Sequence, residues 1–232
     1  MMPLALLLLV PADVETIDSK DFPKEAQVKA VTATVRVVNA AKGFEGSGAL
    51  VHKSGPFLYV LTAAHVVAGA KKVEVATFSA ESHPRPAKVY REAEVLAQSA
   101  EADLAVLRIA TRDDPPGLLR ICAPGSVPEA KGLAALAVGY AAGGAPSCTL
   151  ETIADRRKVR RPGAEAAVVC WEAERAPAKG RSGGPLIDRK GRLIGVASGV
   201  GDAKGYYAHA EEVHAFLKRN ALEWLYEEKS DK

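Results

Sequence analysis

The sequence KGRSGGPL, residues 179–186, places a single hydroxyl, that of Ser182, in a glycine-rich turn. Gly180 lies two positions before the serine, and Gly183 and Gly184 follow it directly. Because glycine has no side chain, the backbone of such a turn permits close approach by another chain. A substrate carbonyl could therefore reach Ser182 and the backbone N–H groups beside it.

A serine nucleophile needs a base to take its proton, and the base needs a group that fixes its tautomer. Two upstream segments offer these parts. Residues 57–67 (FLYVLTAAHVV) indicate a buried strand that ends in small residues and presents His65. Residues 103–109 (DLAVLRI) indicate a strand with Asp103 at its start. The chain order of the three candidates is therefore His, Asp, Ser.

This order, with TAA before His65, DLAVL from Asp103 and GRSGGPL around Ser182, resembles the chymotrypsin-like (trypsin-fold) serine endopeptidases, most closely their bacterial HtrA-like branch. The resemblance covers residues 31–217. It implies that Ser182 is the nucleophile, His65 the general base and then acid, and Asp103 the orienting carboxylate. The N–H groups of Gly180 and Ser182 would form the oxyanion hole. Each residue alone would more often be structural; their combination carries the assignment.

The rest of the chain fits an all-β protein. Short β-branched runs alternate with Gly and Pro signals, and a helical period occurs only near the end. The resemblance implies two six-stranded antiparallel β-barrels with a C-terminal helix. We expect the first barrel over 30–115, the second over 116–209 and the helix over 210–228.

The N-terminal residues indicate export. The apolar run over residues 1–10 is too short to span a bilayer, but it fits the core of a signal peptide, with residues 10–12 as the cleavage region. No Lys or Arg precedes the run, so a hydrophobic tail packed on the body is the alternative. We expect a signal peptide over 1–12, a linker arm over 13–29, and a periplasmic or secreted protein without a stable membrane anchor.

The resemblance also places the pocket for the residue before the cleaved bond. Ala176 would lie at its base, with Ser198, Gly199 and Val200 as its wall, and none of these residues is acidic. We therefore expect cleavage after small or medium aliphatic residues rather than after Lys or Arg.

Arg181 departs from the pattern, because relatives usually carry Asp or Asn before the nucleophile. A guanidinium cannot form the ion pair with a newly cut N-terminus that shapes the oxyanion hole in the digestive branch, so activation by N-terminal cleavage is not expected. Whether the hole exists at rest stays open. Two alternatives therefore remain: a catalytically inactive trypsin-fold binding module, and an esterase-like or self-processing hydrolase.

The three cysteines cannot all pair within one chain. Cys148 and Cys170 flank a polar turn between two predicted strands, where they could form a disulfide in an oxidising compartment and leave Cys122 alone. Buried thiols are the alternative.

The remaining features predict no cofactor and no metal, since the five histidines lack ligand spacing with Cys or carboxylates. A net charge of +3 gives no support for nucleic-acid binding, and the expected partners are protein or peptide substrates. The basic residues at 156–158, 160 and 161 indicate a solvated hairpin loop, with an anionic partner as the second interpretation.

Overall fold

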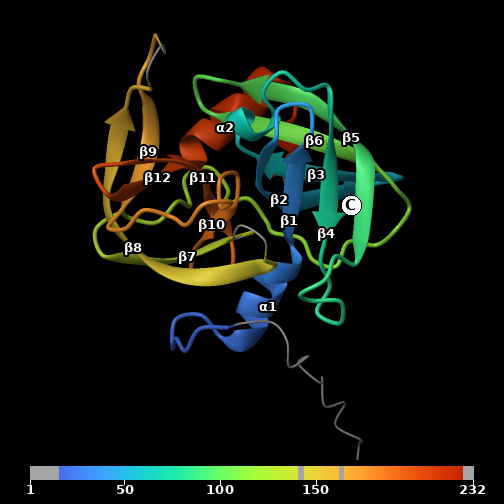
Figure 1. Ribbon diagram of the computed structural model, residues 1–232. Coiled ribbons are helices and arrows are strands. Elements are labelled where there is room, and N and C mark those ends of the chain that lie inside the picture. The colour runs from blue at the N-terminus through green and yellow to red at the C-terminus, as the bar shows by residue number, and fades with distance from the viewer. Residues whose placement is uncertain (1–15, 141–143, 162–164, 227–232) are drawn as a thin grey trace, which may run out of the picture.

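The computed structural model describes residues 16–140, 144–161 and 165–226. The first six strands form a closed antiparallel barrel in the order β1-β2-β3-β6-β5-β4 (Figure 1). The predicted signal peptide over 1–12 lies outside the described residues. The strands are β1 (Thr34–Asn39), β2 (Phe44–Ser54), β3 (Phe57–Thr62), β4 (Lys72–Thr77), β5 (Lys88–Ser99) and β6 (Leu104–Ala110).

The second six strands close a barrel in the order β10-β11-β12-β9-β8-β7, beside the first (Figure 1). The two barrels and the helix that follows them confirm the predicted trypsin-like fold. The strands are β7 (Leu133–Tyr140), β8 (Pro146–Val159), β9 (Val168–Ala173), β10 (Pro185–Ile187), β11 (Leu193–Gly201) and β12 (Lys204–His209).

Each barrel has its own apolar interior. The first is filled mainly by aliphatic side chains such as Val35, Leu58 and Leu107. The second is centred on Trp171, whose indole N–H donates to the Ile194 carbonyl at 2.8 Å. A third apolar cluster joins residues of both barrels and both α-helices, so the barrels are packed together rather than only tethered.

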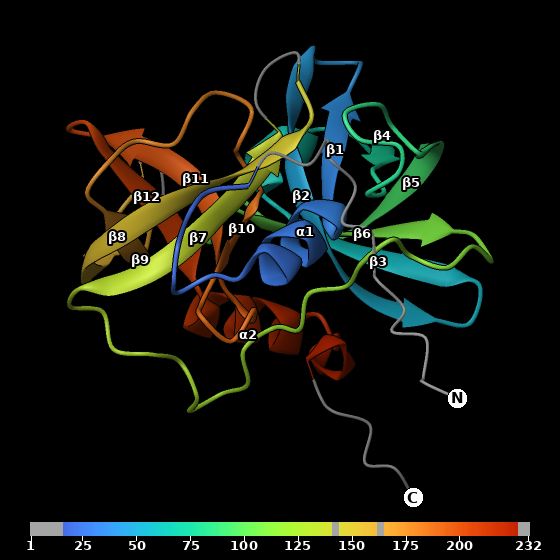
Figure 2. The ribbon, with the colours of Figure 1, turned by 90° about the horizontal axis from the view of Figure 1, so that it is seen from below.

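A helix that the sequence pattern did not reveal lies before the first barrel. The predicted linker arm over 13–29 ends in α1 (Lys24–Thr32), which packs against β1, β7 and β8 between the barrels (Figure 2). Gln27 is fully buried there. Its amide donates to the carbonyls of Ile17 (2.8 Å) and Phe22 (2.7 Å) and accepts from Ile17 N–H at 2.8 Å. A buried glutamine interrupts the helical spacing of apolar residues, and its hydrogen-bond partners lie before the helix. The sequence pattern therefore predicted a linker here.

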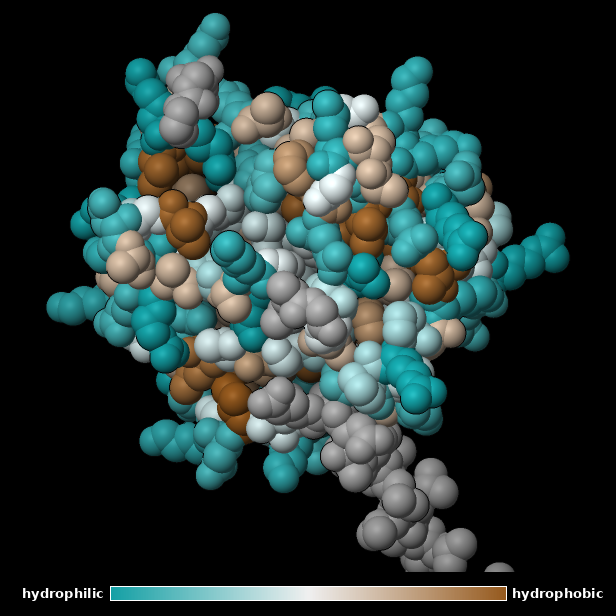
Figure 3. All heavy atoms as spheres, viewed as in Figure 1, coloured by the Kyte–Doolittle hydropathy of each residue, from teal (hydrophilic) through white to brown (hydrophobic). Residues whose placement is uncertain are grey.

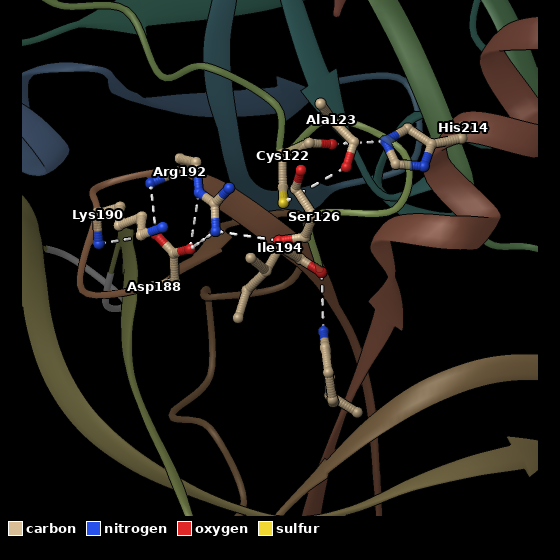
Figure 4. A network of polar contacts seen from close by, with 9 residues as sticks. Cys122, Ala123, Ser126, Asp188, Lys190, Arg192, Ile194 and His214 are labelled. Atoms are coloured by element: carbon tan, nitrogen blue, oxygen red, sulfur yellow. Dashed lines mark hydrogen bonds and ion pairs between the residues drawn. The ribbon is translucent and has the colours of Figure 1, made fainter. Parts of the chain in front are cut away.

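Residues 111–132 join the two barrels and are called the crossing. Polar contacts fasten this crossing to the second barrel (Figure 4). The Arg192 guanidinium binds Asp188 through two nitrogens, at 2.9 and 2.6 Å, and donates to the Ser126 carbonyl at 3.2 Å. On the other side, His214 Nε2 contacts the Cys122 carbonyl at 2.6 Å. These contacts hold the proline-rich crossing against the β10–β11 turn and the C-terminal helix.

The cysteines form no disulfide, and all three are buried thiols. Cys148 lies opposite Val138 on β7, whereas Cys170 lies opposite Arg157, nine residues farther along β8. Of the two possibilities, the buried thiols are therefore confirmed, and the Cys148–Cys170 hairpin disulfide is wrong. Its turn was placed too early, because β8 continues to Val159.

The same long strand changes the interpretation of the basic cluster. Arg156, Arg157 and Lys158 belong to β8 rather than to a loop. Arg156 pairs with Glu211 at 2.5 Å, and Arg157 pairs with Glu172 at 3.2 Å. Much of the predicted solvated loop is thus an ion-paired strand.

No helix in the described part of the chain is long and apolar enough to cross a membrane. On the face seen in Figure 3, hydrophobic residues form small separate groups among hydrophilic side chains.

The C-terminal helix α2 (Ala210–Arg219) begins at an unusual cap. His209 Nδ1 accepts from the Glu211 N–H at 3.1 Å, while its Nε2 is buried without a hydrogen-bond partner. The helix ends at Arg219, earlier than the predicted 228, and a short 3₁₀ turn (Glu223–Leu225) follows. Ala221, with φ of 55°, supplies the left-handed residue that stops the helix between them.

This cap makes stability depend on pH. Burial lowers the pKa of His209 from 6.5 to about 4. Between these pH values, His209 is therefore protonated in the unfolded chain and neutral in the folded one. The contribution of His209 to the free energy of unfolding is fully present above pH 6.5. It is lost as the pH falls from 6.5 to 4, which lowers the free energy of unfolding by on the order of 3 kcal/mol. In His209→Asn, which keeps an acceptor for the cap, this part of the loss should disappear.

Chemical denaturation of both proteins at pH 7, 5.5 and 4 tests the prediction. His214, whose pKa burial also lowers, contributes equally to both and cancels in the comparison. Parallel losses in the two proteins would show that His209 is not the titrating group.

Candidate active site

The first barrel brings His65 and Asp103 together. His65 lies in a 3₁₀ turn (Ala64–Val67) after β3, and Asp103 directly precedes β6. The imidazole Nδ1 lies 3.0 and 2.9 Å from the two Asp103 oxygens, and the His65 backbone N–H donates to Oδ1 at 2.9 Å. The carboxylate thus fixes both the ring and the backbone of the histidine. Nδ1 bears a proton in this arrangement, which leaves Nε2 as the basic nitrogen.

Asp103 is held in a constrained position. Its φ is 53°, a left-handed value that is uncommon outside glycine and often occurs at functional sites. Its side chain is 5% exposed, whereas that of His65 is 46% exposed. Burial alone raises the pKa of Asp103, but the hydrogen bond and charge of His65, the Ser198 hydroxyl and Arg161 bring it below its usual value. The carboxylate of Asp103 is therefore ionised at neutral pH.

The glycine turn that carries Ser182, in the second barrel, packs directly against β2 of the first. Ser47 N–H donates to the Ser182 carbonyl at 2.7 Å, and Ser47 Oγ donates to the Gly180 carbonyl at 2.8 Å. Gly183 has φ of 84°, and a Cβ there would lie 2.2 Å from the Ser47 carbonyl oxygen. Only glycine fits at this position.

Ser182 also lies beside the turn that carries His65. Gly46 separates the two, since a Cβ at that position would be 2.7 Å from both the Ser182 carbonyl and a Val66 methyl. Among the described residues, Ser182 Oγ makes no hydrogen bond to His65. Such a gap is common in proteases without substrate, where the bond tightens on binding. The structure thus places the Ser182 backbone beside the turn that carries His65, without a hydrogen bond between the serine hydroxyl and the imidazole.

The predicted oxyanion donors have no competing partner. Within the residues that the structure describes, neither Gly180 N–H nor Ser182 N–H donates a hydrogen bond. The turn around them is fixed instead by Gly183 N–H to the Ala197 carbonyl at 2.7 Å and by Gly184 N–H to the Arg181 carbonyl at 2.9 Å. Two amides on a fixed turn are thus available to an external acceptor.

Arg181 turns away from these amides and into the second barrel. Its side chain is buried, and its guanidinium donates to the Ala137 carbonyl at 3.3 Å and to Ser147 Oγ at 3.0 Å. Burial raises the pKa of the nearby Glu151, while the charges of Arg175 and Arg181 act in the opposite direction. The guanidinium therefore anchors the turn to β7 and β8.

The predicted specificity residues divide into two groups. Ala176, Gly199 and Val200 lie at the surface, and Val200 is 64% exposed. Ser198 is buried, and its hydroxyl donates to Asp103 Oδ2 at 2.5 Å. Ser198 thus contacts the catalytic carboxylate through its side chain, whereas the other three residues are available to a substrate.

Sequence reasoning missed the roles of two residues. Ser47 supports the nucleophile turn, and its place in the Gly46-Ser47-Gly48 triplet was a usable signal. Arg161 lies 3.4 Å from Asp103 Oδ2, and nothing in its local sequence indicated this. No cluster of metal-binding side chains occurs in the described ranges. The groove of 1170 Å³ beside the crossing is lined by none of the triad candidates.

The fold resembles solved proteases over most of its length. The active form of the Rv3671c protease from M. tuberculosis gives a TM-score of 0.71 at 24% identity, covering 94% of this chain and 92% of that one. An inactive form of Rv3671c gives 0.70 at 25% identity, with 89% and 98% covered. The serine endoprotease from Yersinia pestis gives 0.68 at 21% identity, with 88% and 68% covered.

Comparison of the sequence with curated proteins finds no match. The model of the trypsin-like peptidase domain, however, matches residues 46–196, from the glycine beside Ser47 to the middle of β11. This region contains the His65–Asp103 pair and the Ser182 turn. The chain therefore belongs to the family of trypsin-like peptidase domains and is a hydrolase of the serine endopeptidase class.

Proposed function

We propose that the protein cleaves peptide bonds through an acyl-enzyme on Ser182, with His65 and Asp103 completing the triad. The observation that supports this most is the doubly hydrogen-bonded His65–Asp103 pair beside a glycine turn with two unpaired amides. An inactive binding module would have no need to keep a buried, ionised carboxylate against a half-exposed imidazole.

The reaction follows from this geometry. His65 Nε2 takes the proton of Ser182 Oγ as the oxygen attacks the substrate carbonyl, and Asp103 stabilises the imidazolium that forms. The N–H groups of Gly180 and Ser182 bind the oxyanion. His65 then gives its proton to the leaving amine, and a water molecule, activated by the same histidine, releases the acyl group. On acidification the rate falls, because a protonated imidazole cannot accept the serine proton.

Replacement of the nucleophile tests this proposal. Ser182→Ala should abolish labelling by a fluorophosphonate probe and reduce casein digestion by at least about 10³-fold, because no other group can form the acyl-enzyme. Ser126→Ala, at an exposed serine of the crossing, is the matched control and should behave as wild type.

The outcomes separate the alternatives. A folded wild type that the probe does not label would favour a trypsin-fold binding module. Labelling combined with cleavage of esters, but of neither casein nor peptides, would favour an esterase-like or self-processing hydrolase.

We further propose that cleavage follows small or medium aliphatic residues. Ala176, Gly199 and Val200 offer a small, uncharged surface with no carboxylate to bind a Lys or Arg side chain. A peptide library should show at least about tenfold higher kcat/KM for Ala, Val or Leu before the cleaved bond than for Arg, in line with the free energy of burying one aliphatic side chain. Preferred cleavage after Arg would overturn this assignment.

We also propose that the protein is exported, on the basis of the apolar run over residues 1–10 and the small residues that follow it. Expression in a bacterium with periplasmic fractionation and mass spectrometry of the N-terminus should give a mature chain that lacks residues 1–12. Cytoplasmic protein that retains Met1 would contradict it.

A further inference from the structure

The catalytic carboxylate contacts a second cation besides His65. Arg161 follows β8, and its Nη1 lies 3.4 Å from Asp103 Oδ2. Its Nη2 donates a short hydrogen bond to Ser198 Oγ, which in turn donates to the same Oδ2 at 2.5 Å. One carboxylate oxygen thus interacts with the imidazole at 2.9 Å, a serine hydroxyl and a guanidinium.

The guanidinium is placed for this contact rather than for solvent. The Arg161 side chain is 23% exposed, and its Nε is buried without a hydrogen-bond partner. An arginine on a surface hairpin with no partner would keep all the N–H groups of its guanidinium in water. Its neighbour Arg160 is exposed, which makes the two residues a natural pair for comparison.

The other ionisable groups near this cluster do not neutralise Arg161. Cys170 on β9 is a thiol whose pKa burial raises to about 11, so it is uncharged at neutral pH. Glu212 on α2 acts on Cys170 as well and accepts the Val169 N–H at 2.8 Å. Among the described residues, Glu212 forms no ion pair with Arg161, whereas Asp103 does. Arg161 therefore pairs with Asp103, and Asp103 also contacts His65.

We propose that Arg161 is a positioning residue of the catalytic site, which orients Ser198 and Asp103 and sets, by its positive charge, the pH at which His65 takes up a proton. The assignment rests on the triad proposed above. As Ser182 gives up its proton, the imidazolium must share Asp103 with a cation already present. The charge of Arg161 therefore opposes protonation of His65 and extends activity toward acid pH.

The test compares wild type with three variants. Arg161→Gln removes the charge and keeps an amide donor, Arg161→Lys keeps the charge, and Arg160→Gln removes the neighbouring exposed charge. The first readout is the pH dependence of fluorophosphonate labelling. The second is the NMR titration of the His65 imidazole in a Ser182→Ala background, assigned with His65→Gln, which needs no activity.

In Arg161→Gln, we expect the midpoint of both profiles to rise by about 0.5 to 1 pH unit, because a nearby cation is removed. Arg161→Lys and Arg160→Gln should stay within about 0.2 pH unit of wild type, since lysine keeps the positive charge and the exposed charge of Arg160 is screened by solvent and salt. A merely structural role would lower the labelling rate at every pH without moving the midpoint.

The two readouts separate the two proposals. If wild type is not labelled at any pH, the proposed function fails, while the NMR titration still tests Arg161. If wild type is labelled but the His65 titration is the same in wild type and Arg161→Gln, the role of Arg161 is overturned. Circular dichroism and thermal melting confirm that each variant is folded.

Discussion

The candidate active site depends on one close approach, that of β2 to the turn that carries Ser182. Two Ser47 hydrogen bonds hold the carbonyls of Ser182 and Gly180, and the Ser47 hydroxyl also accepts the Tyr140 N–H of β7 at 2.7 Å. The Ser47 hydroxyl therefore both donates and accepts a hydrogen bond where the two barrels meet. The same turn is also fixed by the Gly183 N–H to the Ala197 carbonyl and by the Gly184 N–H to the Arg181 carbonyl, whereas the amides of Gly180 and Ser182 donate to no other described residue.

The charges of the site form two separate groups. On one side, Asp103 gathers the imidazole, Ser198 and Arg161 around a buried carboxylate. On the other, Arg181 extends behind the turn to the Ala137 carbonyl and Ser147. A cation at this position cannot reproduce an acidic residue paired with a new N-terminus. Arg181 instead binds β7 and β8, which are present without any cleavage.

The sequence was most informative where chemistry and local pattern coincide. The TAA segment before His65, the acid before an apolar strand and the glycine turn at Ser182 were all visible locally, and the barrel strands followed from their turns and alternation. What escaped depends on distant contacts. Helix α1 is organised by buried Gln27, which no apolar period reports.

Two further errors have the same origin. The length of β8 is set by pairing with β9, and the basic run at 156–158 resembled a loop because its ion-pair partners, Glu211 and Glu172, lie far along the chain. The contact of Arg161 with Asp103 joins residues 58 positions apart across two barrels. The spacing of residues along the chain does not predict such a contact.

The position of α1 has a consequence for biosynthesis. The helix packs against β1, which follows it immediately, but also against β7 and β8, which end at Val159. As the chain leaves the ribosome, the face of α1 that belongs to the second barrel stays uncovered until most of the protein has been made. The first barrel can therefore close early, whereas the N-terminal helix settles only when its last partner strands arrive. In a chain that lacks these strands, Ala30 and Val31 of this face are therefore without part of the apolar cover that they have in the complete fold.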